Sequence, residues 1–219
     1  MTENSDNARR DVKARGTRWA KSIAAGLSKT GIRPNTISLL SIVFAAIAGV
    51  LLIFSEKTTF PGNSIFLVAA AVFIQIRLLC NLFDGMVAVE GGKGSPSGIL
   101  FNDFPDRIAD PLIFVCAGYA AQNIPTAVEI GWLTGLLSVF TAYVRTLAGA
   151  SGAKQLFLGP MAKQHRLALI TIAILASAAA GKWEYNGLIL MAILVIISLG
   201  CVITSVRRLI KAMRELETK

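Results

Sequence analysis

The chain has 219 residues, of which 54% are hydrophobic and only 16% are charged, and its mean hydropathy is +0.61. This composition excludes an ordinary soluble domain and indicates a protein with several membrane-spanning helices. The formal net charge of +9 would also suit a nucleic-acid-binding protein, but the basic residues gather at the two ends of the chain, beside apolar runs and without interleaved aromatic residues. We therefore expect membrane headgroups, and no nucleic acid, as the partners of this charge.

Residues 1–33 are predicted to form a cytoplasmic and interfacial segment. They are polar and basic and lack the apolar stretch and cleavage site of a signal peptide. Apolar side chains recur at helical spacing in the second half of this segment and lie opposite basic ones, which is typical of an amphipathic helix at the membrane interface. The apolar positions are Trp19, Ala20, Ile23, Ala24 and Leu27, and the basic positions are Arg15, Arg18 and Lys29.

Residues 34–206 are predicted to form an all-α integral membrane domain with six transmembrane helices, followed by a basic cytoplasmic tail at 207–219. Lys and Arg are frequent before the first apolar run, after the last one, and in the second and fourth connections. This bias places both termini in the cytoplasm. The apolar runs, found with a window of roughly 20 residues, are 36–54, 63–83, 98–121, 128–149, 167–181 and 187–206.

Six acid or amide side chains form a cluster beside or inside the second and third apolar runs, with Asp103 at its edge. Asn81 and Asp84 are three residues apart, and Asn102, Asp106 and Asp110 are four residues apart, so each set shares one face of a helix. A carboxylate near hydrocarbon costs roughly 2.5 kcal/mol or more, so such a cluster indicates an ion, proton or phosphate site rather than packing. Hard oxygen donors without thiolate or imidazole suit Mg²⁺, Mn²⁺ or Ca²⁺.

The residues around this cluster resemble the signature of the CDP-alcohol phosphotransferases. Asp84-Gly85-x-x-Ala88, followed by Gly98-x-x-x-Asn102-x-x-x-Asp106, has the spacing of the family pattern DxxDGxxAR, a short spacer, then GxxxDxxxD. The stretch Gly31-Ile32-Arg33-Pro34-Asn35-Thr36-Ile37-Ser38 is similar to the family's entry into its first span. Six helices after an interfacial helix is also the family's architecture, so the resemblance covers nearly the whole chain.

The resemblance implies a reaction, a cofactor and a location. Family members transfer a substituted phosphate, in most bacterial members the phosphatidyl group of CDP-diacylglycerol, to an alcohol hydroxyl with release of CMP, in phospholipid biosynthesis. Two divalent ions, Mg²⁺ or Mn²⁺, would bridge the carboxylates and the diphosphate. The implied partners are CDP-diacylglycerol or another CDP-alcohol, a polar alcohol acceptor and the lipid bilayer. We expect a bacterial inner-membrane protein whose site faces the cytoplasm, and the family's dimers suggest a homodimer.

The resemblance also implies roles for individual residues. Asp84 matches a metal-binding acid, and Asp106 matches the last acid of the signature, which acts as base in the family. The basic residues near the fourth and fifth runs resemble a family loop that binds phosphate. The implied metal ligands are Asn81, Asp84, Asn102, Asp106 and Asp110; the groups near the CDP diphosphate are Asp84, Gly85, Ala88, Gly98 and Lys93; and the acceptor or phosphate ligands are Arg145, Lys163 and Arg166.

Three positions depart from the signature. Asn81 and Asn102 stand where Asp is expected, and Val89 stands where Arg usually follows Ala. An Asn oxygen can bind a hard cation but brings no charge, so metal affinity should fall. Asp110 and Asp103 would restore some of that charge. If Asp106 and Asp110 are instead aligned with the last two acids of the signature, the base is Asp110 and not Asp106.

The interpretation leaves alternatives open. The departures also fit a catalytically degenerate member that binds CDP-lipid or metal as a regulator or scaffold. An ion or proton transporter is disfavoured because the acids gather at one leaflet and no inverted repeat is evident. Arg77, about one turn before Asn81, either pairs with an acid of the site or extends toward the cytoplasmic surface.

Overall fold

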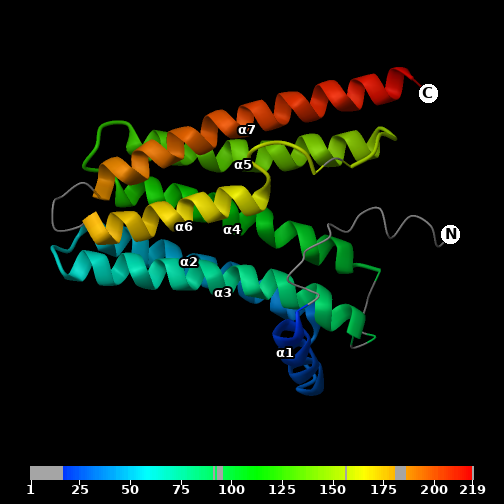
Figure 1. Ribbon diagram of the computed structural model, residues 1–219, viewed down its shortest axis with the longest axis horizontal. Coiled ribbons are helices and arrows are strands. Elements are labelled where there is room, and N and C mark those ends of the chain that lie inside the picture. The colour runs from blue at the N-terminus through cyan, green and yellow to red at the C-terminus, as the bar shows by residue number, and fades with distance from the viewer. Residues whose placement is uncertain (1–16, 91, 93–95, 156, 181–185, 219) are drawn as a thin grey trace.

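The computed structural model describes residues 17–90, 92, 96–155, 157–180 and 186–218. Within these ranges the chain forms α-helices joined by short connections and contains no strand, which confirms the all-α prediction. Six helices lie side by side along the long axis, and α1 lies across one end of them (Figure 1). The helices are α1 (Arg18–Lys29), α2 (Pro34–Glu56), α3 (Gly62–Glu90), α4 (Gly98–Ala120), α5 (Ala127–Ala150), α6 (Lys163–Ala180) and α7 (Asn186–Glu217).

Each predicted apolar run falls on one helix, from α2 to α7 in order. By length and composition, α2, α3, α5 and α7 are long and apolar enough to cross a bilayer. The other two helices carry charge near their beginnings: α4 contains Asp103, Asp106, Arg107 and Asp110, and α6 starts with Lys163 and Arg166 in its first turn. The structure therefore supports an integral membrane protein, and six complete spans remain a prediction.

The helix α1 has the amphipathic form predicted for it. Ala20 and Ala24 are fully buried in an apolar cluster with residues of α3, whereas Trp19 and Ile23 are 48% and 45% exposed. The Trp19 ring meets the Phe83 ring edge-on, with 6.2 Å between their centroids. Since Phe83 adjoins Asp84, this helix lies next to the predicted site.

The last helix is longer than its apolar run. α7 continues without interruption for 32 residues, from Asn186 to Glu217. At about 1.5 Å per residue it exceeds a hydrocarbon core of about 30 Å, so it projects beyond the bilayer. Most of the predicted tail at 207–219 is therefore a continuation of the last helix.

The outer face of the bundle is apolar, and its interior contains many small residues. Ile65, Leu136 and Leu199 are each more than 60% exposed, as expected for side chains that face lipid. Inside, α4 and α5 approach closely at Gly118 and Gly131. A Cβ atom on Gly118 would lie 2.7 Å from the Ala127 carbonyl oxygen and 2.9 Å from the Gly131 Cα. This crossing requires glycine, because neither backbone atom can move without moving a helix.

We expect Gly118→Ala to lower the free energy of unfolding by about 1–3 kcal/mol, because the added methyl group overpacks a backbone contact. Gly26→Ala in α1 is the matched control, since a Cβ atom there meets no atom within 4 Å. Thermal unfolding of both variants in detergent measures the difference. Equal unfolding temperatures for the two variants would contradict the close crossing of α4 and α5.

Candidate active site

Three helices bring acidic and basic side chains together near one end of the bundle. The end of α3 and the beginning of α4 lie toward this end, and α1 packs against α3 there (Figure 1). On each helix the contributing residues are three or four positions apart, so they lie on one face. The α3 residues are Arg77, Asn81 and Asp84; the α4 residues are Asp106 and Asp110; and the α6 residues are Lys163 and Arg166.

Three of these residues, Asp84, Asp106 and Asp110, form what we call the acidic cluster. Their exposed fractions are 4%, 4% and 1%. Buried carboxylates are stable only when they are paired or hydrogen-bonded. The contacts of each one therefore indicate what it can do.

Asp106 is bound on both of its carboxylate oxygens. Its Oδ1 accepts hydrogen bonds from Arg77 Nη2 and Asn81 Nδ2, each at 2.7 Å. Its Oδ2 forms an ion pair with Lys163 Nζ, and the Lys163 side chain is 28% exposed. Asp106 is thus connected to the surface through a lysine, which makes it the more accessible of the two acidic-cluster residues on α4.

Asp110 lies one turn deeper and is held by two arginines. Arg77 Nη2 donates to its Oδ1 at 2.5 Å, and Arg166 Nη2 donates to its Oδ2 at 3.3 Å. Arg166 also donates to Thr141 Oγ1 at 2.8 Å and to the Met161 carbonyl oxygen at 3.0 Å. These bonds fix Asp110 between α3 and α6.

Asp84 is held by neutral donors. Ser38 Oγ donates to its Oδ2 at 2.6 Å, and the Gly85 amide donates to its Oδ1 at 2.5 Å. Among the described residues it forms no ion pair with a cationic side chain. Asp84 is therefore the carboxylate of the cluster whose charge is left for an external cation.

Asp103 belongs to a second group at the rim of the site. It accepts from Arg107 Nη2 at 2.5 Å and from Arg145 Nη2 at 2.7 Å. The Arg145 guanidinium also lies over the Phe157 ring, 5.0 Å from its centroid. The charge of Asp103 is thus paired with two arginines instead of contributing to the acidic cluster.

The connection before α6 is anchored on α7, and this positions Lys163 and Arg166. Arg208 donates to the Leu158 carbonyl oxygen from Nε at 2.8 Å and to the Thr141 carbonyl oxygen from Nη1 at 2.7 Å. Gly159 has a φ of +116°, and a Cβ atom there would lie 2.5 Å from Thr204 Cγ2. Glycine is therefore required where this connection turns against α7.

The structure brings together most of the residues that the sequence analysis selected. Asn81 contacts Asp106, and Arg77 joins Asp106 to Asp110. Asp84 lies near enough to Asp106 and Lys163 to interact with them electrostatically, and Gly85 contacts Asp84 through its amide. Ala88 and Gly98 are partly buried at the adjoining ends of α3 and α4. Lys163 and Arg166 pair with the acids, and Arg145 lies at the rim. Lys93 and the side chain of Asn102 lie outside the described residues.

One functional contact was not predicted, and another was one of two alternatives. Ser38 lies in the stretch noted for its resemblance to the family, but its bond to Asp84 joins residues 46 positions apart, which no local pattern reveals. Arg77 was left open between two roles, and its position four residues before Asn81 on the same helical face was the signal for the first of them.

The donor set of the site fits a hard divalent ion that shares its ligands with a substrate. All candidate ligands are oxygens, as Mg²⁺ and Mn²⁺ prefer. Within the described ranges no three acidic, histidine or cysteine side chains are close enough to hold a metal ion by themselves. Mg²⁺ sites of one or two carboxylates completed by substrate phosphates are common, and Asp84 with Asn81 can form the protein half of such a site.

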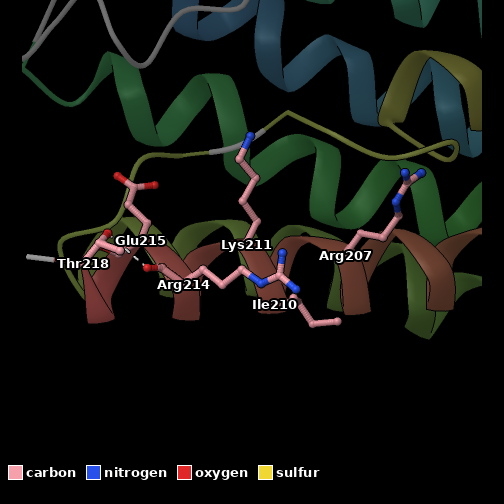
Figure 2. Close-up of a pocket in the computed structure, with 6 residues that line it drawn as sticks. All are labelled: Arg207, Ile210, Lys211, Arg214, Glu215 and Thr218. Atoms are coloured by element: carbon pink, nitrogen blue, oxygen red, sulfur yellow. Dashed lines mark hydrogen bonds between the residues drawn. The ribbon is translucent and has the colours of Figure 1, made fainter.

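A separate shallow hollow lies at the C-terminal end of α7 (Figure 2). Its side chains reach from one helix face toward the segment after α5, where the Lys154 amide donates to Glu215 Oε1 at 3.1 Å. None of its residues belongs to the acidic cluster, and its basic side chains suit contacts with headgroups. The lining residues are Arg207, Ile210, Lys211, Arg214, Glu215 and Thr218.

No family model matches the chain, but comparison with known proteins finds related sequences and structures. The chain is 26% identical to a phosphatidylinositol phosphate synthase of Streptomyces avermitilis over 208 residues, which cover 91% of this chain and 80% of that protein. This similarity spans both halves of the signature and the six-helix domain. The similarity agrees with the resemblance of the signature to the CDP-alcohol phosphotransferases.

Two further similarities agree with this resemblance. The chain is 23% identical to the inner membrane protein YnbA of Escherichia coli over 164 residues, which cover 74% of this chain and 77% of that protein. The crystal structure of the Mycobacterium tuberculosis phosphatidylinositol phosphate synthase in complex with manganese and citrate has the same fold, with a TM-score of 0.72, 22% identity, and coverage of 89% of this chain and 88% of that one. The helical bundle is thus the fold of a CDP-alcohol phosphotransferase.

Proposed function

We propose that the protein transfers the phosphatidyl group of CDP-diacylglycerol to the hydroxyl of a polar alcohol and releases CMP, in phospholipid biosynthesis. The observation that carries this proposal is the meeting of Asp84 and Asp106 at one buried site, since these are the two acids of the family signature that this chain retains. A purely structural role would not require a carboxylate, Asp84, that lacks a cationic partner among the described residues.

In this proposal Asn81, Asp84 and Asp106 hold a divalent ion, Mg²⁺ or Mn²⁺, together with the diphosphate of the donor. When bound, the ion neutralises charge that develops on the leaving CMP. The manganese in the mycobacterial structure supports this choice of cation. Near Asp84, the small residues Gly85, Ala88 and Gly98 provide the close backbone approach for the CDP group.

Asp106 acts as the general base in this proposal. It takes the proton of the acceptor hydroxyl while the new oxygen–phosphorus bond forms and the phosphoanhydride bond to CMP breaks. Its Lys163 contact places it nearer the surface than Asp110, whose two oxygens are both held by arginines. Asp110 is then a positioning residue that keeps Arg77 and Arg166 in place.

The acceptor and phosphate groups are bound at the rim by Arg145 and Lys163. Both are partly exposed, with side-chain exposures of 17% and 28%, and both can exchange a carboxylate partner for a phosphate. The Arg166 side chain is only 3% exposed and supports the site through its ion pair with Asp110. Because the similar proteins of Streptomyces avermitilis and Mycobacterium tuberculosis are phosphatidylinositol phosphate synthases, an inositol phosphate is the first acceptor to test.

The location is part of the same proposal. The site lies at the end of the bundle that carries α1 and the basic end of α7 (Figure 1). Basic flanks favour the cytoplasmic side, so the site would face the cytoplasm of a bacterial inner membrane. A homodimer would form through the apolar outer faces of the bundle.

The test incubates purified protein with radiolabelled CDP-diacylglycerol, Mg²⁺ or Mn²⁺, and a panel of alcohols that includes inositol phosphate, glycerol phosphate and serine. We expect release of CMP with at least one acceptor and loss of release after chelation of the metal. If the protein binds nucleotide but releases no CMP with any metal or acceptor, the degenerate regulator or scaffold becomes the better interpretation.

A further inference from the structure

Arg77 is a fully buried cation at the centre of the site. It is 0% exposed and lies in a largely apolar part of α3. Among the fully buried side chains of the described residues, Arg77 is the largest. A single nitrogen, Nη2, contacts Asp106 Oδ1 at 2.7 Å and Asp110 Oδ1 at 2.5 Å. The guanidinium thus bridges two carboxylates on successive turns of α4, as a metal ion bridges its ligands.

The other donors of this guanidinium are not used within the described part of the chain. Nε and Nη1 of Arg77 are buried and have no hydrogen-bond partner. Buried donors in native proteins nearly always have partners, so the unpaired ones indicate a missing acceptor. The oxygens of a bound diphosphate supply acceptors of the right chemistry for an arginine.

The charges around Arg77 limit how many metal ions the site can hold. Arg77, Lys163 and Arg166 pair with Asp106 and Asp110, so the three cations equal in number the three carboxylates of the acidic cluster, and Asp84 alone has no ion pair among the described residues. A donor diphosphate brings two negative charges and neutralises one divalent ion. A second divalent ion would leave uncompensated positive charge in a buried region, which is unfavourable.

We propose that Arg77 is a fixed cation of the active site that takes the place of one of the two divalent ions, so that the protein binds a single Mg²⁺ or Mn²⁺ on the Asp84 side. The Asp-to-Asn departures at Asn81 and Asn102 follow from this, because a site with one ion needs fewer carboxylates. The inference rests on the proposed function and specifies its cation site.

The test counts Mn²⁺ bound by the full-length protein in detergent with saturating CDP-diacylglycerol and no acceptor alcohol, from the electron paramagnetic resonance signal of free Mn²⁺. The wild-type protein should bind one Mn²⁺ per chain. Arg77→Gln should bind a second one, because Asp106 and Asp110 lose the cation that bridged them. Arg77→Lys keeps the charge and should bind one. Arg107→Gln is the matched control, since Arg107 pairs with Asp103 and not with the acidic cluster.

Thermal unfolding gives a readout that does not depend on turnover. Without metal, Arg77→Gln should unfold about 10 °C below the wild type, since one partner of a buried ion pair is removed. Added Mn²⁺ should restore most of this loss in Arg77→Gln and much less in Arg107→Gln. An Arg77→Gln protein that fails to fold without Mn²⁺ but folds when purified with it also supports the proposal.

Several results would overturn the role of Arg77: two Mn²⁺ bound by the wild type, none bound by it, or one bound by both the wild type and Arg77→Gln. None of these counts depends on CMP release. If the counts are as expected but no acceptor yields CMP, the Arg77 inference stands and the transferase proposal fails. If CMP is released but the wild type binds two Mn²⁺, the transferase proposal stands and the Arg77 inference fails.

Discussion

Asp106→Asn is expected to lower the rate of CMP release by a factor of about 10²–10⁴, the usual contribution of a general base. Asn has nearly the same shape and keeps an oxygen that can accept from Arg77 and Asn81, the two donors that contact Asp106 Oδ1. It cannot take a proton from the acceptor hydroxyl. The loss should therefore appear mainly in kcat.

Asp110→Asn separates the two possible positions of the base. Both Asp110 oxygens face arginines, so this variant should retain more CMP release than Asp106→Asn. Glu129→Gln, on the exposed first turn of α5, is the control and should keep the wild-type rate. Full activity of Asp106→Asn together with an inactive Asp110→Asn would assign the base to Asp110.

The helices and the acid positions follow from the sequence for simple physical reasons. Apolar runs long enough to cross a bilayer form helices because every backbone group must be satisfied internally. Helical spacing then brings Asn81 and Asp84 to one face of α3, and Asp106 and Asp110 to one face of α4. These local relations needed no knowledge of how the helices pack.

The pairing of charges could not be predicted in the same way. Lys163 and Arg166 were expected around an acceptor phosphate, but in the structure they pair with Asp106 and Asp110. Those contacts depend on how α6 lies against α3 and α4. The apolar run predicted to end at residue 83 is shorter than its helix, because α3 continues to Glu90. Gly85 and Ala88 are tolerated in this extension because the helix packs against its neighbours.

The second large effect concerns stability. Arg166→Met is expected to lower the free energy of unfolding by about 3–5 kcal/mol, because it removes one cation from a buried ion pair and leaves Asp110 partly uncompensated. The same change leaves Thr141 Oγ1 and the Met161 carbonyl oxygen without this donor. The unfolding temperature in detergent should fall by roughly 10 °C.

Arg145→Met is the matched control for this variant. Arg145 also pairs with an aspartate, but its side chain is 17% exposed and Asp103 keeps Arg107 as a second partner. Its removal should cost about 1 kcal/mol or less, as for ion pairs near the surface. Asp110→Asn in the Arg166→Met background should recover part of the loss, because the unpaired charge is then gone. Equal destabilisation by Arg166→Met and Arg145→Met would mean that the Arg166 contact with Asp110 does not stabilise the buried site.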